Sequence, residues 1–165
     1  MKKRIMMILC TLTVCVFTAC GANNDTSKQS EDGKNEIANP FIQCDTMEDA
    51  TKVAGFEMEV PDAIGEYSKY QIEAIDKDLI QVIYQKGETS LLVRKAVGSE
   101  DISGDYNDYS ETNTVTVGNL EVMMKGEKGM VSVATWMDQD YSFAIDAQDS
   151  PMSSEEVSTL IESVH

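Results

Sequence analysis

The stretch from residue 97 to 113 carries the side chains whose types and spacing come closest to a recognisable chemistry. Four oxygen-bearing residues stand there at alternate positions: Asp101, Ser103, Asp105 and Asn107. Oxygen ligands at positions 1, 3, 5 and 7 are typical of a calcium-binding loop. The pattern is incomplete, because Tyr106 occupies the place of the sharp-turn glycine and Thr112 stands at position 12. The four residues are candidate metal ligands, and the sequence favours the alternative, a turn in which their side chains accept hydrogen bonds from nearby amides.

Aromatic side chains could instead provide a surface for a protein, peptide or glycan partner. Trp136 is the only tryptophan of the chain, and its place depends on the turn before Tyr141. A three-residue turn puts Trp136 on the sheet face away from the aliphatic residues of its strand. A four-residue turn puts it in the core, which the large area of an indole ring favours. On the first alternative, Trp136 would form a partner surface together with Tyr106 and Tyr109.

Histidine chemistry is nearly excluded. His165 is the only histidine and the last residue, so neither a multi-histidine zinc site nor a Ser-His-Asp triad on internal residues is available. With 29 Asp and Glu residues, any fold brings some carboxylates together by chance, and hydrolysis by such a pair stays a lower alternative. The sequence names no catalytic residue and no cofactor, and it predicts a protein that is not an enzyme.

The first twenty residues, MKKRIMMILCTLTVCVFTAC, carry the clearest targeting signal. Three basic residues precede an uncharged apolar run, Ile5 to Phe17, and small residues then lead to Cys20. This order is typical of a secretory signal peptide, and the run is shorter than the ~20 residues that a membrane span needs. The segment resembles the type II signal peptide and lipobox of bacterial lipoproteins. That resemblance implies cleavage after Ala19, acylation of Cys20 and attachment to the extracytoplasmic face of the cell membrane.

Cleavage would leave a strongly acidic chain with one folded part. The 13 basic and 29 acidic residues give a net charge of −16, and loss of the three basic residues in 1–19 makes it −19. Such a charge repels nucleic acid, so no nucleic-acid partner is expected. After the signal peptide over 1–19, residues 20–38 form a polar tether and 39–165 one globular domain. Cys44 alone remains in that domain, and a buried small side chain is favoured over a reactive thiol.

The apolar pattern changes from helical to alternating and back. Asp45 to Ala54 has helical spacing behind a start that resembles a capping box. Short segments with period two, separated by Gly, Asn and Asp turns, then run from Phe56 to Ile145. A second capping box opens a helix over Ser154–Val164. The sequence therefore predicts an α+β fold, a twisted antiparallel sheet of about seven or eight strands with two short helices packed on it.

Several local motifs occur together along the domain. They are Gly55-Phe56 with Pro61 ahead of the sheet, the DISGDYN loop over 101–107, Lys125-Gly126, Ala134-Thr135-Trp136 and the last Ser-x-x-Glu helix. Over about residues 40–165 this combination resembles the DUF4367 family of extracytoplasmic domains. The family is uncharacterised, so the resemblance implies no reaction and no substrate.

Taken together, these features predict a membrane-anchored extracytoplasmic lipoprotein that acts without catalysis, as a binding, sensor or accessory module. Its partners would be the membrane, through the lipid anchor, and a protein, peptide or glycan. A structural envelope-associated protein is one alternative, and a carboxylate-based hydrolase is another. A deep pocket or exposed aromatic patch would favour the first function, and a cleft with two facing carboxylates the last.

Overall fold

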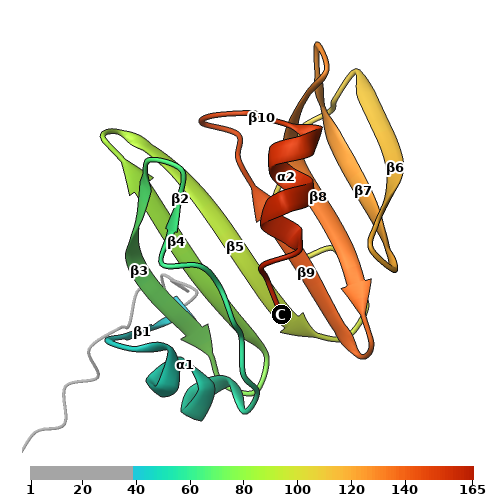
Figure 1. Cartoon of the computed structure of the whole chain (residues 1–165). Helices are drawn as coiled ribbons and strands as arrows, with labels where there is room; N and C mark the ends of the chain where they lie inside the picture. Colours follow the sequence, from blue (N-terminus) through green and yellow to red (C-terminus); the bar gives the residue numbers. More distant parts are fainter. Residues whose placement is uncertain (1–38) are drawn as a thin grey trace, which may run out of the picture. The chain divides into compact units, whose positions relative to one another are not determined.

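The computed structural model describes residues 39–165, which form ten strands and two helices (Figure 1). In chain order they are β1 (Ile42–Cys44), α1 (Met47–Ala54), β2 (Ala63–Ile64), β3 (Tyr67–Ile75), β4 (Leu79–Lys86), β5 (Thr89–Val97), β6 (Glu111–Val117), β7 (Leu120–Glu127), β8 (Met130–Asp138), β9 (Tyr141–Asp146), β10 (Met152–Ser153) and α2 (Ser154–Ile161).

All strand pairs among the described residues are antiparallel, and they form a single sheet. The main order is β1-β3-β4-β5-β9-β8-β7-β6, with β2 added on β3 and β10 on β8. After β5 the chain passes through residues 98–110 to β6 at the far edge, and it returns strand by strand to β9 (Figure 1). Two meanders therefore meet side by side where β5 pairs with β9.

The two faces of the sheet differ in what covers them. One face, here the helix-covered face, carries Val82, Val93, Ile145 and Ala134 in one row, and these residues belong to the core cluster that includes both helices. The other face, here the open face, carries the residues that alternate with them: Gln81, Arg94, Asp146, Lys125 and Thr114. No helix of the described chain packs on the open face, so polar side chains can gather there.

Local hydrogen bonds start both helices. The hydroxyl of Thr46 accepts from the backbone N–H of Asp49 at 3.1 Å and caps α1. Ser153 and Glu156 form the capping box of α2 that the sequence predicts. Past α2, the backbone of His165 exchanges two hydrogen bonds with Glu59, at 2.8 and 3.1 Å, so the end of the chain is held against the helix-covered core.

The predicted α+β class with seven or eight strands is wrong, because the described residues are mostly β and contain ten strands. Three strands, β1, β2 and β10, have only two or three residues each. A period-two pattern needs about four residues to be recognised, so such strands leave no signal in the sequence. Each of the two helices has eight residues and covers only part of one face.

Gly126 allows β7 and β8 to pair past an irregularity in their register. The pairing shifts between Lys125 and Gly126, and a Cβ at Gly126 would lie 1.9 Å from the backbone oxygen of Met130. We expect Gly126→Ala to lower the free energy of unfolding by about 1–3 kcal/mol or more, because backbone atoms must move. Urea denaturation measures this loss. The exposed neighbour Glu127 supplies the control, since Glu127→Ala should change stability by less than ~0.5 kcal/mol. Equal losses in the two variants would contradict the steric argument.

Candidate functional site

The DISGDYN loop folds through its own side chains. Asp101 Oδ1 accepts from the N–H of Ser103 at 2.9 Å, Ser103 Oγ from that of Asp105 at 3.3 Å, and Asp105 Oδ1 from that of Asn107 at 2.9 Å. Asp101 Oδ2 also pairs with Lys125 at 3.2 Å. Within residues 39–165, no group of three or more His, Cys, Asp and Glu side chains is placed to hold a metal ion. Three of the four candidate metal ligands, Asp101, Ser103 and Asp105, therefore serve as successive turn-forming acceptors in this structure, and the side chain of Asn107 donates instead.

Arg94 of β5 fixes this loop to the open face. Its Nη1 donates to the carbonyl oxygens of Ile102, at 3.1 Å, and Ser103, while its Nε donates to Gln81 Oε1 at 2.6 Å. Gly104 makes the close approach feasible: its φ is +70°, and a Cβ there would lie 2.6 Å from Arg94 Nη1. Ser103 is buried as a result. The loop over residues 98–110 thus covers part of the open face, and Arg94 attaches it to the central strand β5. We call this loop the covering loop.

Asp146, the last residue of β9, lies on the same face. Its direct neighbours on the adjoining strands are Leu92 of β5 and Val133 of β8, and both are apolar. Burial of the carboxyl group raises the pKa of Asp146. Hydrogen bonds from the backbone and side-chain amides of Gln148, each 3.1 Å long, and the positive charge of Arg94 oppose this shift without cancelling it. The carboxyl group of Asp146 therefore keeps its proton to a higher pH than an ordinary aspartic acid does.

A second carboxyl group, Asp105, is linked to Asp146 through two amides. Asp105 Oδ1 accepts from Asn107 Nδ2 at 2.7 Å, and the same Nδ2 donates to Gln148 Oε1 at 2.9 Å. The negative charge of Asp105 contributes to the raised pKa of Asp146. Asp105 Oδ2 is buried and has no hydrogen-bond partner among the described residues. We call Asp105 and Asp146 the carboxylate pair.

Tyr109 lies next to the carboxylate pair. Burial raises the pKa of Tyr109 to about 12, and the nearby Asp105 carboxylate adds to the shift. The phenol therefore keeps its proton at neutral pH and can donate a hydrogen bond. Tyr106, in contrast, is 98% exposed.

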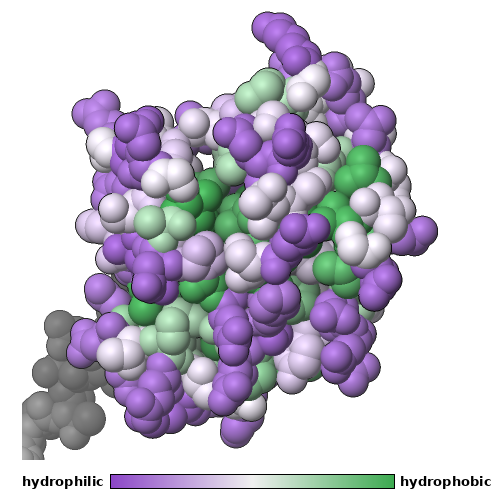
Figure 2. Space-filling view, in the orientation of Figure 1, coloured by the Kyte–Doolittle hydropathy of each residue, from purple (hydrophilic) through white to green (hydrophobic). Residues whose placement is uncertain are grey.

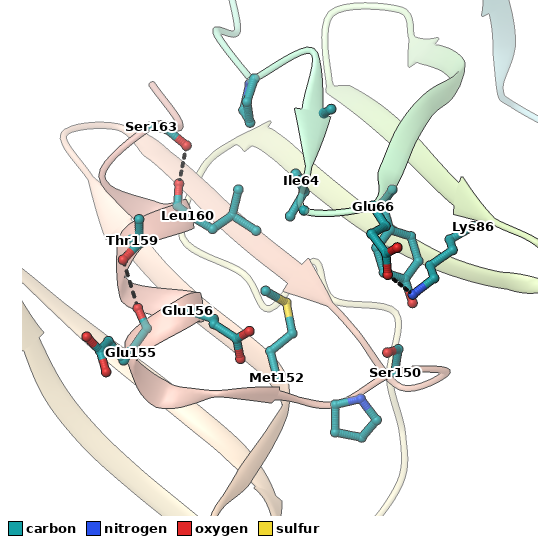
Figure 3. A pocket seen from close by; sticks show the side chains of 15 residues that line it. Ile64, Glu66, Lys86, Ser150, Met152, Glu155, Glu156, Thr159, Leu160 and Ser163 are labelled. Atoms are coloured by element: carbon teal, nitrogen blue, oxygen red, sulfur yellow. Dashed lines mark hydrogen bonds and ion pairs between the residues drawn. The ribbon is translucent and has the colours of Figure 1, made fainter.

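A cavity of about 690 Å³ lies on the helix-covered face, between β2 and α2 (Figure 3). Ile64, Met152 and Leu160 give it apolar walls, and Figure 2 shows hydrophobic residues gathered between these elements with hydrophilic ones around them. Two of the carboxylates that line it are held by neighbouring side chains. Lys86 pairs with Glu66 and lowers its pKa, while bonds from Ser153 lower that of Glu156. These interactions favour the ionised form of Glu66 and Glu156, two of the three carboxylates that line the cavity.

Trp136 lies on the helix-covered face, away from both tyrosines. It is 4% exposed and stacks on Phe143, with ring centroids 5.1 Å apart. The favoured placement of Trp136 in the core is confirmed, although the turn before Tyr141 contains two residues and both predicted turn lengths are wrong. The structure therefore does not bring Trp136 into a surface with Tyr106 and Tyr109. Cys44 is buried, and burial together with nearby carboxylates raises the pKa of its thiol.

Sequence reasoning missed most of the residues around the carboxylate pair: Gln81, Arg94, Asp146 and Gln148. A signal for one of them was present, because Gln81 lies between apolar residues on both sides in β4. A polar side chain at such a position needs a partner, which here is Arg94. Cys20, the predicted lipid-attachment residue, and residues 1–38 lie outside the described part of the chain.

Comparison with known families gives a sequence match. The model of the family described as glycosyl hydrolases family 2, TIM barrel domain, matches residues 1–142. Because this match spans more than half of the chain, the chain belongs to that family. No curated protein and no solved structure gives a significant match. The resemblance to DUF4367 is thereby overturned, and so are the predictions of a non-catalytic module and of a protein that is not an enzyme.

The fold does not share the barrel in the family's description. A TIM barrel has eight parallel strands, each followed by a helix, in about 250 residues. Residues 39–165 contain only antiparallel strand pairs, and the match stops at Ser142, before Asp146 and α2. Membership therefore rests on sequence, and the geometry of a barrel active site cannot be carried over to this chain. No helix in the described part of the chain is long and apolar enough to cross a membrane.

Proposed function

We propose that the chain has a glycosidase-related function and that the carboxylate pair is its chemical centre. The family match supports a glycosidic substrate. The observation that carries the choice of site is the raised pKa of Asp146 beside a second carboxylate. Glycoside hydrolysis commonly uses two carboxyl groups, one that donates a proton and one that acts as an anion. An environment that raises the pKa of one carboxyl group favours that group as the proton donor.

In this proposal Asp146 is the general acid. The apolar neighbours Leu92 and Val133 favour its protonated form, which can donate to the oxygen of the departing sugar or aglycone. Asp105 stabilises the positive charge that develops on the sugar ring, or activates water against it. Its Oδ2 has no hydrogen-bond partner among the described residues and is free to accept from such a water.

The neighbouring amides position the two carboxyl groups. Gln148 donates to Asp146, and Asn107 bridges Asp105 to Gln148, so the two acids are held in one hydrogen-bonded chain. Tyr109 adds a protonated phenol that can donate to a sugar hydroxyl. These are positioning and binding roles, which leave the proton transfer to Asp146.

Access to the carboxylate pair requires a movement of the covering loop. Because Asp105 Oδ2 is buried, a sugar reaches it only when part of the loop over 98–110 is displaced. Gly98 and Gly104, both at positive φ, flank the segment that must move. The ion pair between Asp101 and Lys125 contributes little against such an opening, whereas the hydrogen bonds from Arg94 to Ile102 and Ser103 must break if their segment moves.

The decisive experiment is hydrolysis of chromogenic aryl glycosides by the full-length protein, with several sugars in both anomeric configurations. We expect turnover of at least one substrate that is lost on substitution of Asp146. If no aryl glycoside is hydrolysed faster than in buffer, the proposed function fails.

We also propose that the protein is held on the extracytoplasmic face of the membrane through Cys20, on the residue pattern of 1–20 alone. Cys20→Ser should remove the anchor, because acyl chains contribute ~0.8 kcal/mol per buried CH₂. Fractionation and the mass of the mature protein measure this, and Cys15→Ser is the matched control that should keep the anchor. A Cys20→Ser protein that stays processed and membrane-bound would contradict the proposal.

A further inference from the structure

The two edges of the sheet are protected to different degrees. The edge strand β1 has three residues, whereas the edge strand β6 at the other end has seven. Proteins usually protect long edges with proline, lysine, a bulge or a covering segment. Between Thr112 and Val117, β6 has the sequence TNTVTV, with no charge and no proline, and its pairing with β7 is regular. Figure 1 shows no other described element beside this edge.

Three threonines present the free backbone groups of this edge. The β6–β7 hairpin closes with a two-residue turn, and Val117 pairs with Leu120. In such a hairpin the residues of the closing pair bond each other, and the direction of the backbone groups alternates from there. The backbone N–H and C=O groups of Thr112, Thr114 and Thr116 therefore point away from β7, toward the open edge of the sheet. No residue outside the hairpin donates to or accepts from them in the described part of the chain.

We propose that β6 pairs antiparallel with β6 of a second copy, about a two-fold axis at Thr114. Thr114 then faces itself, and Thr112 faces Thr116 of the second copy, so each facing threonine pair exchanges two backbone hydrogen bonds. The one charged residue of the strand, Glu111, faces Val117, so no like charges are opposed. Met123 of β7 is exposed and pairs with Thr114, so the Met123 residues of the two copies would lie on either side of the facing Thr114 residues.

The charge of the chain sets how strongly this dimer forms. Each copy carries a net charge of −16, which repels the other, and one strand pair buries less than the ~1,000 Å² of a stable interface. The dimer should therefore depend on protein concentration and become tighter when salt screens the repulsion.

Sedimentation equilibrium of the full-length protein tests the proposal, at low and high salt and over a wide concentration range. Thr114→Lys places two like charges at the axis and should weaken the dimer by about tenfold or more. Gln43→Lys on the edge strand β1 changes the net charge by the same amount and should leave the dimer intact or tighten it. Thr114→Pro removes the N–H at the axis, and circular dichroism shows whether the fold is kept.

Three results would overturn the proposal. One is a monomer at every concentration and salt level. The second is a dimer that both Thr114 variants leave unchanged, which would place the contact elsewhere, including residues 1–38. The third is equal weakening by Gln43→Lys and Thr114→Lys, which would make the effect one of overall charge.

Discussion

Asp146→Asn is expected to lower the rate of aryl glycoside hydrolysis by about 10²- to 10⁴-fold, the usual contribution of a general acid. The loss should be largest for substrates with poor leaving groups, because these depend most on proton donation. Asparagine keeps the size of the side chain and one acceptor for the backbone N–H of Gln148. Steady-state kinetics with two leaving groups of different acidity measure the effect.

The same residue fixes the sign of the pH dependence. Burial raises the pKa of Asp146 in the folded protein above its value in the unfolded chain. Its contribution to stability is present at low pH and is lost as pH rises through the folded pKa. Activity that needs the protonated acid should fall over the same rise in pH. Asp146→Asn should therefore abolish this limb of the rate profile without lowering stability at neutral pH.

The matched control for this prediction is Asp108→Asn in the same loop. Asp108 is exposed and makes no side-chain hydrogen bond or ion pair within the described residues. Its substitution removes one negative charge near the site and should leave the rate within about twofold. A similar loss in both variants would mean that overall charge, and not proton donation by Asp146, controls the rate.

Trp136→Ala is expected to lower the free energy of unfolding by about 3–5 kcal/mol, because a large buried ring is removed from a packed core. Trp136 stacks on Phe143 with 8° between the ring planes, so the loss includes an aromatic contact. Urea denaturation followed by circular dichroism measures the change.

Tyr106→Ala supplies the comparison, since its ring is 98% exposed. Stability should then change by less than ~0.5 kcal/mol. If Trp136→Ala proved as mild as Tyr106→Ala, the indole would not lie in the core. Binding of a glycan or peptide that depended on Trp136 would contradict its burial in the same way.

The sequence predicted those elements that local residues specify. The capping box of α2 depends on Ser153 and Glu156, which are three residues apart. The turn between β8 and β9 could not be read in this way. Its residues Gln139 and Asp140 include no glycine, although Gln139 adopts a φ of +55°. Turn length decides which face Trp136 occupies, so an error of one residue moves the whole strand pattern.

The candidate site was predicted only in part. Asp105 and Asn107 were predicted as candidate metal ligands and Tyr109 as part of a partner surface, so the sequence pointed to the loop and not to a carboxylate pair. Asp146 was not predicted, since its raised pKa depends on Leu92 and Val133, which precede it by 54 and 13 positions and become its neighbours only through strand pairing. Charge and burial created by distant strands have no local pattern in a sequence. Lys125, which holds Asp101, is likewise brought to the loop by β7.

The joint between β5 and β9 has a consequence for how the chain acquires its structure. Within each meander, neighbouring strands are joined by tight hairpins and can form early. The seam that unites them pairs Val93 with Ile145, residues far apart in the chain, and must wait for a long loop to close. We therefore expect the pairing of β5 with β9 to be the slowest step of folding. Before β5 and β9 pair, each is an open edge strand, and Val93 and Ile145 are exposed to water. The chain is most prone to aggregation at that stage.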